Sequence, residues 1–314
     1  MKNIVILFLL YLFFVPVLLN AYDNHRYIYI DGDNQFTSER GLRSGNGSKE
    51  SPFVIGDYEI SAPEEYAGIT INNTKKYFII RKCYIHGNGN SIGISLYNSK
   101  NAKIEDTILE NMDTGINNKY ESLIQQISKC SISNCNVGIR NVNSIKSIIY
   151  SRFQNCRVGI INEYTDIANN VVDMFKVTSN IEAIEHCDIL NCGNGISNAG
   201  SIKTISQCTI SECGTGVSNE YSNFYIPTIQ KITDNNIYKN QFGVNNKSGL
   251  YYGVGYYMPN IDNSDSTINA RNNWWGSPGG PGGVGPGTGD KISEKVKYEP
   301  WEETKIENIG VNYQ

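Results

Sequence analysis

Two stretches of the sequence, written one above the other, decide the fold. Residues 181–198 read IEAIEHCDILNCGNGISN, and residues 202–219 read IKTISQCTISECGTGVSN. Three apolar positions, both cysteines, both glycines and the final asparagine coincide. A repeat of this size is typical of solenoid proteins, in which each repeat buries its apolar residues against the next one.

The same pattern extends over most of the chain. A Gly-Ile or Gly-Val pair recurs at intervals of 25, 22, 23, 21, 36, 21 and 27 residues. Isoleucine dominates the positions six, eleven and fourteen residues before the glycine. The glycines are Gly68, Gly93, Gly115, Gly138, Gly159, Gly195, Gly216 and Gly243; the asparagines three residues after them are Asn118, Asn141, Asn162, Asn198, Asn219 and Asn246.

These columns predict an all-β fold, a right-handed single-stranded parallel β-helix with N- and C-terminal caps. Stacked turns place like residues about 4.8 Å apart, and β-branched isoleucine packs well on such a surface. We expect the glycines at corners that have no room for a Cβ. We expect the asparagines at a bend, with a left-handed backbone and with side-chain amides linked from turn to turn. A leucine-rich repeat is the rival solenoid, but leucine is nearly absent from the columns.

The two ends of the chain differ from the repeats. Residues 1–21 combine a basic start, an apolar run and Ala21 at a plausible cleavage point, which predicts a signal peptide; an uncleaved membrane anchor is the alternative. We divide the rest into an N-terminal cap with the first strands (22–67), the repeats (68–250), and a last turn with a Trp/Gly/Pro-rich C-terminal cap (251–314). The adjacent Trp274 and Trp275 either seal the solenoid or form a carbohydrate platform. The expected location is secreted, periplasmic or cell-surface.

All length variation falls directly after the asparagine column, so every large insertion leaves one edge of the solenoid. Insertions on one face often form a binding face, although solvated loops are also tolerated there. The two longest insertions both open with Glu-Tyr. A groove at this edge would have Tyr164, Tyr221, Phe224 and Tyr225 as its wall and Glu163, Asp166 and Glu220 on its rim.

The same edge offers the best acid pair for catalysis. Glu163 and Glu220 occupy equivalent positions two turns apart, which places them about 10 Å apart along the stack. Inverting glycosidases hold their carboxyl groups ~6.5–9.5 Å apart. Glu163, Glu220 and Asp166 are therefore the candidate catalytic residues, but surface acids on loops would show the same pattern.

Cysteines, metals and charge restrict the other function classes. The eight cysteines fall mainly in two inward-facing columns, which favours free buried thiols, although bridges between neighbouring turns are sterically allowed. Their five-residue spacing differs from a zinc clip and only three histidines are present, so we predict no metal and no cofactor. The net charge is −4 and basic runs are short, so we expect no nucleic-acid partner.

Motifs at both ends carry a family resemblance. Residues 272–278 read NNWWGSP and lead into a Gly/Pro run, followed by Gly289-Asp290 and by Tyr298 to Trp301. Together with residues 45–60 near the start of the chain, these motifs resemble the end segments of secreted bacterial and archaeal β-helix proteins. The chain is similar to the pectin-lyase-like superfamily and to the NosD family of periplasmic copper-binding β-helix proteins. The resemblance implies the fold, whereas relatives include polysaccharide lyases, hydrolases, epimerases and many proteins without known activity.

The sequence therefore predicts an extracellular or cell-surface protein with a non-catalytic, glycan-binding or surface-structural and adhesive role. The alternative is a polysaccharide-active enzyme (lyase, hydrolase or epimerase) of the pectin-lyase-like superfamily. The expected partner is a polysaccharide or a surface glycoprotein. A membrane would be contacted only through an uncleaved signal segment, and the sequence does not predict the oligomeric state.

Overall fold

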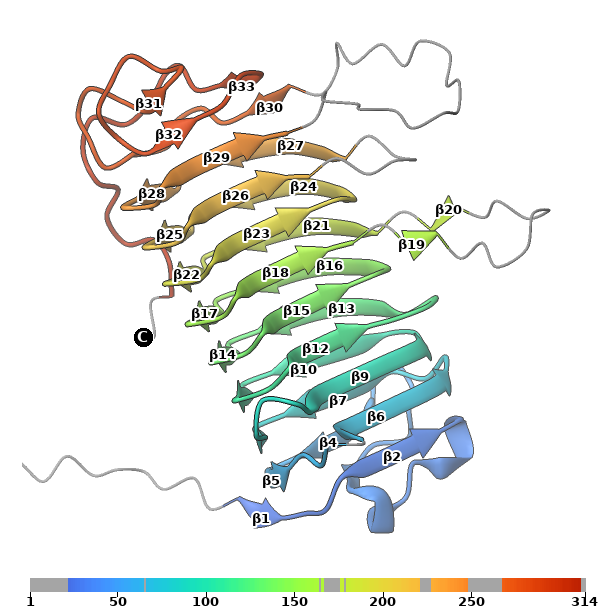
Figure 1. Cartoon of the computed structure of the whole chain (residues 1–314). Helices are drawn as coiled ribbons and strands as arrows, with labels where there is room; N and C mark the ends of the chain where they lie inside the picture. Colours follow the sequence, from blue (N-terminus) through green and yellow to red (C-terminus); the bar gives the residue numbers. More distant parts are fainter. Residues whose placement is uncertain are drawn as a thin grey trace, which may run out of the picture.

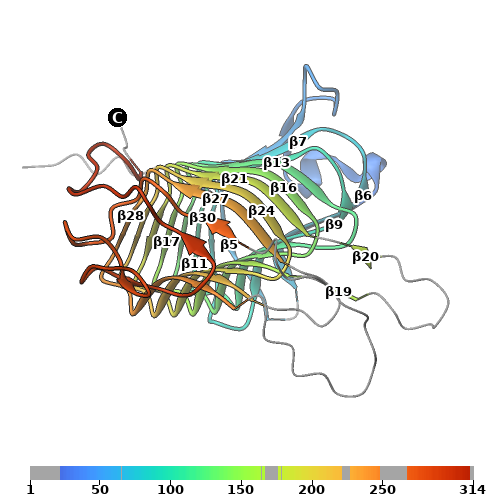
Figure 2. The same cartoon turned by 90° about the horizontal axis from the view of Figure 1, so that it is seen from above.

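The computed structural model describes residues 22–64, 66–163, 165–166, 176–177, 179–220, 227–247 and 267–311. These residues form a right-handed parallel β-helix of about eight turns, which confirms the predicted fold (Figure 1). The turns lie over one another when the molecule is viewed from above (Figure 2). The predicted signal peptide lies outside the described residues. Within them, no helix has the length and apolarity needed to span a membrane.

Three sheets run along the solenoid, and each regular turn contributes one strand to each sheet. Sheet A contains β1 (Asp23–Asn24), β5 (Tyr58–Ser61), β8 (Tyr84–His86), β11 (Ile108–Glu110), β14 (Ser131–Ser133), β17 (Arg152–Gln154), β22 (Asp188–Leu190), β25 (Thr209–Ser211) and β28 (Asn236–Tyr238). Sheet B contains β2 (Ile28–Asp31), β6 (Ala67–Thr74), β9 (Ile92–Ser99), β12 (Thr114–Asn118), β15 (Val137–Asn141), β18 (Val158–Asn162), β23 (Asn194–Asn198), β26 (Thr215–Asn219), β29 (Phe242–Asn246), β32 (Lys291–Ile292) and β31 (Gly282–Gly283).

Sheet C completes each turn. It contains β3 (Leu42–Ser44), β4 (Phe53–Gly56), β7 (Phe78–Arg81), β10 (Ala102–Glu105), β13 (Leu123–Ser128), β16 (Ser144–Ile149), β21 (Asn180–Glu185), β24 (Ser201–Ser206), β27 (Thr228–Thr233), β30 (Ile268–Asn269) and β33 (Val296–Lys297). The remaining elements are an antiparallel pair, β19 (Thr165–Asp166) and β20 (Lys176–Val177), and two short 3-10 helices, η1 (Asp33–Gln35) and η2 (Ser38–Arg40).

The isoleucine columns form the core. Ile181 pairs in register with Ile202, and Ile202 with Ile229, so like side chains stack along the axis. The first two are fully buried and Ile229 is 2% exposed. Burial of one such side chain stabilises the fold by roughly 1.5–3 kcal/mol, and this gain recurs at every turn.

The glycine column is tightly packed, but it does not form a corner. Gly115 lies inside strand β12, and a Cβ built on it would stand 2.6 Å from the carbonyl oxygen of Gly138 on the next turn. The expected lack of room is therefore confirmed, whereas the expected position at a bend is wrong. The bends on either side of sheet A use non-glycine residues with positive φ, such as His186 (52°) and Asn191 (51°).

The asparagine column forms the predicted amide ladder. Each side-chain Nδ2 donates a hydrogen bond to the Oδ1 of the next turn, over 2.7 to 3.1 Å, from Asn118 through to Asn246. All six side chains are buried. None of these residues has a positive φ, so the expected left-handed backbone is wrong. Each is the last residue of its sheet B strand, and it needs only an extended backbone to stack its amide.

The eight cysteines are free and buried, as predicted. Burial raises the pKa of the Cys83 and Cys130 thiols to about 12, so both stay protonated and unreactive near neutral pH. These thiols fill core positions that small side chains occupy on other turns.

The first part of the segment 267–311 lies over the last regular turn (Figure 1). Strands β30 and β33 extend sheet C, and β32 and β31 extend sheet B. The chain then turns back along sheet A, where the backbone N–H of Ile306 donates to Asn236 Oδ1 (2.9 Å) and that of Val311 donates to Asp188 Oδ1 (3.2 Å). Backbone contacts thus bind the C-terminal segment to turns that precede it by more than 60 residues.

Candidate functional site

The structure describes only part of the predicted groove at the insertion edge, which is the edge of the solenoid where the loops after the asparagine column leave. Tyr164, Tyr221, Phe224 and Tyr225 lie outside the described residues. Asp166 belongs to β19, where its backbone pairs with Lys176 of β20. The predicted aromatic wall therefore stays a prediction.

Glu163 and Glu220 lie two turns apart in register, as the repeat predicts, because Asn162 pairs with Asn198 and Asn198 with Asn219. Each carboxylate is bound by a cation of a neighbouring turn. The Arg140 guanidinium donates to both oxygens of Glu163 (2.7 and 2.8 Å), and the Lys247 ammonium donates to both oxygens of Glu220 (3.0 Å). This arrangement favours ion pairs between turns over a pair of carboxylates that act on one bond.

The same edge carries an aromatic pair that sequence reasoning missed. Tyr97 and Tyr120 are 43% and 38% exposed, and their rings stack with centroids 5.5 Å apart at 24°. Tyr97 follows Gly93 by four residues, which is the spacing of Glu163 after Gly159. That spacing was the signal that could have placed Tyr97 on the insertion edge.

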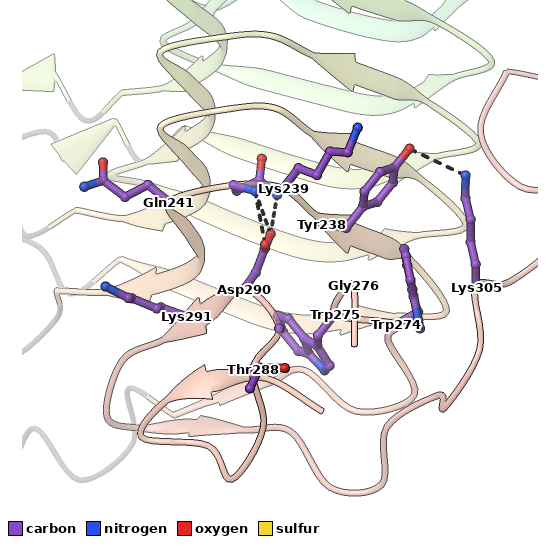
Figure 3. A pocket seen from close by; sticks show the side chains of 12 residues that line it. Tyr238, Lys239, Gln241, Trp274, Trp275, Gly276, Thr288, Asp290, Lys291 and Lys305 are labelled. Atoms are coloured by element: carbon purple, nitrogen blue, oxygen red, sulfur yellow. Dashed lines mark hydrogen bonds between the residues drawn. The ribbon is translucent and has the colours of Figure 1, made fainter. Parts of the chain in front are cut away.

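A distinct hollow lies at the C-terminal end of the solenoid, with a volume of about 640 Å³ (Figure 3). Four separate segments of the chain meet there. The end of sheet A and the bend after it supply one wall, the Trp-Trp-Gly motif supplies a second, and the start of β32 with Lys305 supplies the rest. We call it the C-terminal pocket; it is lined by Tyr238, Lys239, Asn240, Gln241, Trp274, Trp275, Gly276, Thr288, Gly289, Asp290, Lys291 and Lys305.

Aromatic rings form one side of the C-terminal pocket. The Tyr238 and Trp274 rings lie with centroids 5.2 Å apart, tilted by 53°. The Lys305 ammonium lies 4.9 Å from the centre of the Tyr238 ring and 3.5 Å from its hydroxyl. Both rings are half-buried, so each keeps part of its surface open to a ligand.

Asp290 stands on the opposite side and is 7% exposed. Its carboxylate accepts hydrogen bonds from the Asn240 backbone N–H (3.1 Å) and from Asn240 Nδ2 (2.6 Å). Burial raises the pKa of Asp290 to about 6, and the Asn240 hydrogen bonds oppose that rise. Asp290 therefore joins the C-terminal segment to the last turn, and it carries less negative charge below neutral pH than an exposed aspartate does.

The buried Trp275 contributes a polar atom to this region. Its side chain is fully buried, yet its indole Nε1 has no hydrogen-bond partner. An N–H without an acceptor costs about 1–3 kcal/mol when it is shielded from water.

Three lysines complete the C-terminal pocket. Lys239 pairs with Glu212 over 3.1 Å, whereas Lys291 and Lys305 lie near the Phe242 and Tyr238 rings. Partly exposed rings and ammonium groups together suit a ligand that has an apolar face and oxygen acceptors. No group of three or more His, Cys, Asp or Glu side chains suitable for a metal ion occurs in the described part of the chain.

The structure separates the two tryptophans that the sequence places side by side. Trp275 is fully buried against the core, as a sealing residue would be, whereas the half-buried Trp274 keeps open surface in the C-terminal pocket, as a platform residue would. Sequence reasoning missed Tyr238, Asp290 and Lys305 as neighbours of Trp274, because nothing in the repeat brings their segments together.

Comparisons of this chain with protein-family models, with curated proteins and with solved structures found no match.

Proposed function

We propose that this protein is a secreted or cell-surface β-helix that binds carbohydrate at the C-terminal pocket and does not catalyse its conversion. The observation that carries the proposal is the pairing of Tyr238 and Trp274 beside polar groups in one hollow. Aromatic faces bury the C–H face of a sugar ring, while ammonium groups donate to its oxygens. Lys291 and Lys305 favour sugars that carry a carboxylate or a sulfate.

The end motifs support a relationship with the pectin-lyase-like superfamily or with the NosD-like β-helix family. The parallel β-helix is in keeping with either one. Fold alone does not assign an activity, so the proposal rests on the site. The cation partners of Glu163 and Glu220 favour the non-catalytic role over the enzymatic one.

Isothermal titration calorimetry with a panel of neutral and acidic oligosaccharides tests the proposal. Trp274→Ala should weaken the binding of an active oligosaccharide at least tenfold, because it removes one of the two paired aromatic rings of the pocket. Tyr150→Ala is the matched control, since it removes a 37%-exposed aromatic side chain that lies outside the pocket. Equal affinity of both variants and the wild type would reject the C-terminal pocket as the site.

Incubation with the corresponding polysaccharides tests the absence of catalysis. The expected result is that chain length stays constant. Chain shortening that Glu163→Gln or Glu220→Gln abolishes would establish the enzymatic alternative instead.

A further inference from the structure

A second hollow of about 500 Å³ lies on the outer face of sheet C, near the N-terminal end of the solenoid. Lys103 of β10, Gln125 of β13 and Lys146 of β16 line it on three successive turns. Lys49 and Tyr77 flank it on the side of β4 and β7. Figure 2 shows β7, β13 and β16 along the same side of the molecule.

Positive charge gathers around this hollow in a chain whose net charge is −4. The ammonium groups of Lys49, Lys103 and Lys146 belong to exposed side chains. None of these three lysines takes part in an ion pair within the described ranges; the ion pairs found there involve other cations. The exposed Lys75 and Lys76 immediately precede Tyr77 in the chain, at the bend that leads into β7.

The surface around this hollow that carries the lysines, here called the basic area, has a defined length. It runs from β4 to β16, four strand steps of about 4.8 Å, or roughly 19 Å along the axis. Glu182 of β21 stands next to Lys146 in register and ends it, and Lys203 of β24 lies beyond Glu182. A ligand that uses the whole area must therefore be extended along the solenoid axis and carry several negative charges.

The side chains between the lysines indicate which kind of polyanion this hollow would bind. The half-buried Tyr77 and Ile79 offer apolar surface between the lysines, and the Gln125 and Asn101 side chains offer amides. Apolar faces that alternate with acidic groups are the chemistry of an acidic polysaccharide. Single-stranded nucleic acid would need several exposed aromatic rings for base stacking, and one half-buried tyrosine does not supply them.

We infer that this face, with Lys49, Lys103, Lys146 and Tyr77 as its centre, binds an extended carboxylated or sulfated polysaccharide strand parallel to the solenoid axis. The site is separate from the C-terminal pocket and extends the proposed function with a second contact surface. The evidence for this second site comes only from residues on the outer face of sheet C. An experiment can therefore reject either site without rejecting the other.

The test measures binding of the full-length mature protein to polygalacturonate and to heparin by biolayer interferometry at 50 mM NaCl. Lys103→Gln/Lys146→Gln should weaken binding about tenfold, and binding by the wild type should fall when the salt is raised to 300 mM. The matched control is Lys203→Gln/Lys231→Gln, which removes two exposed lysines from the same sheet outside the hollow. This control should change affinity less than twofold, and circular dichroism should show that both variants are folded.

Three outcomes would overturn the inference. They are an unchanged affinity of the Lys103/Lys146 variant, an equal loss in the control variant, or single-stranded DNA binding as tight as that of both glycans. Trp274→Ala should retain binding to polygalacturonate and heparin. If this variant lost that binding as well as oligosaccharide binding at the C-terminal pocket, one site would account for both activities.

Discussion

Removal of one rung from the asparagine ladder should destabilise the protein strongly. Asn162 is fully buried; its Nδ2 donates to Asn198 Oδ1 (2.8 Å) and to the Ser201 carbonyl (3.1 Å), and its Oδ1 accepts from Asn141 Nδ2 (2.8 Å). Asn162→Ala removes all three hydrogen bonds and leaves their partners buried. At about 1 kcal/mol for each bond, the free energy of unfolding should fall by about 3 kcal/mol.

Urea unfolding followed by far-ultraviolet circular dichroism measures this loss. Asn155→Gly is the matched control, because Asn155 is an exposed asparagine in a second row of amides on the same turn. Its φ of 57° suits glycine, so this change should cost about 1 kcal/mol or less. If Asn162→Ala were no more destabilising than Asn155→Gly, the ladder would not support the fold in the way described.

Three further predictions concern pH, packing and thiols. Because the pKa of Asp290 rises from 3.8 to about 6 on folding, docking of the C-terminal segment should be most stable below pH 4 and lose up to about 3 kcal/mol as the pH rises past 6. Fluorescence of the three tryptophans, all of which lie in that segment, should report this slope in urea titrations, and an Asp290→Asn variant with the same slope would contradict the assignment. Gly138→Ala should cost at least 3 kcal/mol in thermal unfolding, since its Cβ would lie 2.4 Å from a carbonyl oxygen, whereas Gly279→Ala, whose nearest neighbour is 3.7 Å away, should be tolerated. Mass spectrometry after brief iodoacetamide treatment should find the eight cysteines unmodified in the native protein and alkylated in urea; rapid native labelling would disprove their burial.

The sequence was sufficient to predict the solenoid, because the apolar columns recur at fixed offsets and only stacking can bury them. It misplaced the glycines because the atom that excludes a Cβ from Gly115 belongs to Gly138, on the next turn. Several bends that lead into sheet A carry residues such as His186 and Gln207 in the left-handed region, and these two residue types give no local turn signal. Neighbouring turns impose that conformation, and a reading of isolated segments does not capture it.

The candidate site was harder to predict from the sequence than the fold. The Trp-Trp motif drew attention to Trp274, but Tyr238 precedes it by 36 residues and Lys305 follows it by 31. Their approach depends on how the C-terminal segment folds back over the last turn. For the same reason, the lysines of the sheet C face are spread over the sequence and align only when the turns are stacked.

The asparagine ladder also has a direction. Every amide donates toward the C-terminal end, so the side-chain dipoles add head to tail over five steps, about 24 Å. At the first rung, Asn118 Oδ1 has no donor, because the preceding turn places Leu96 beside it in register. The two ends of the ladder are thus chemically different: the Oδ1 of Asn118 lies beside an apolar leucine, whereas the Nδ2 of Asn246 donates to the Lys295 carbonyl of the C-terminal segment (3.3 Å). A solenoid of otherwise similar turns therefore has an electrical polarity along this row of amides.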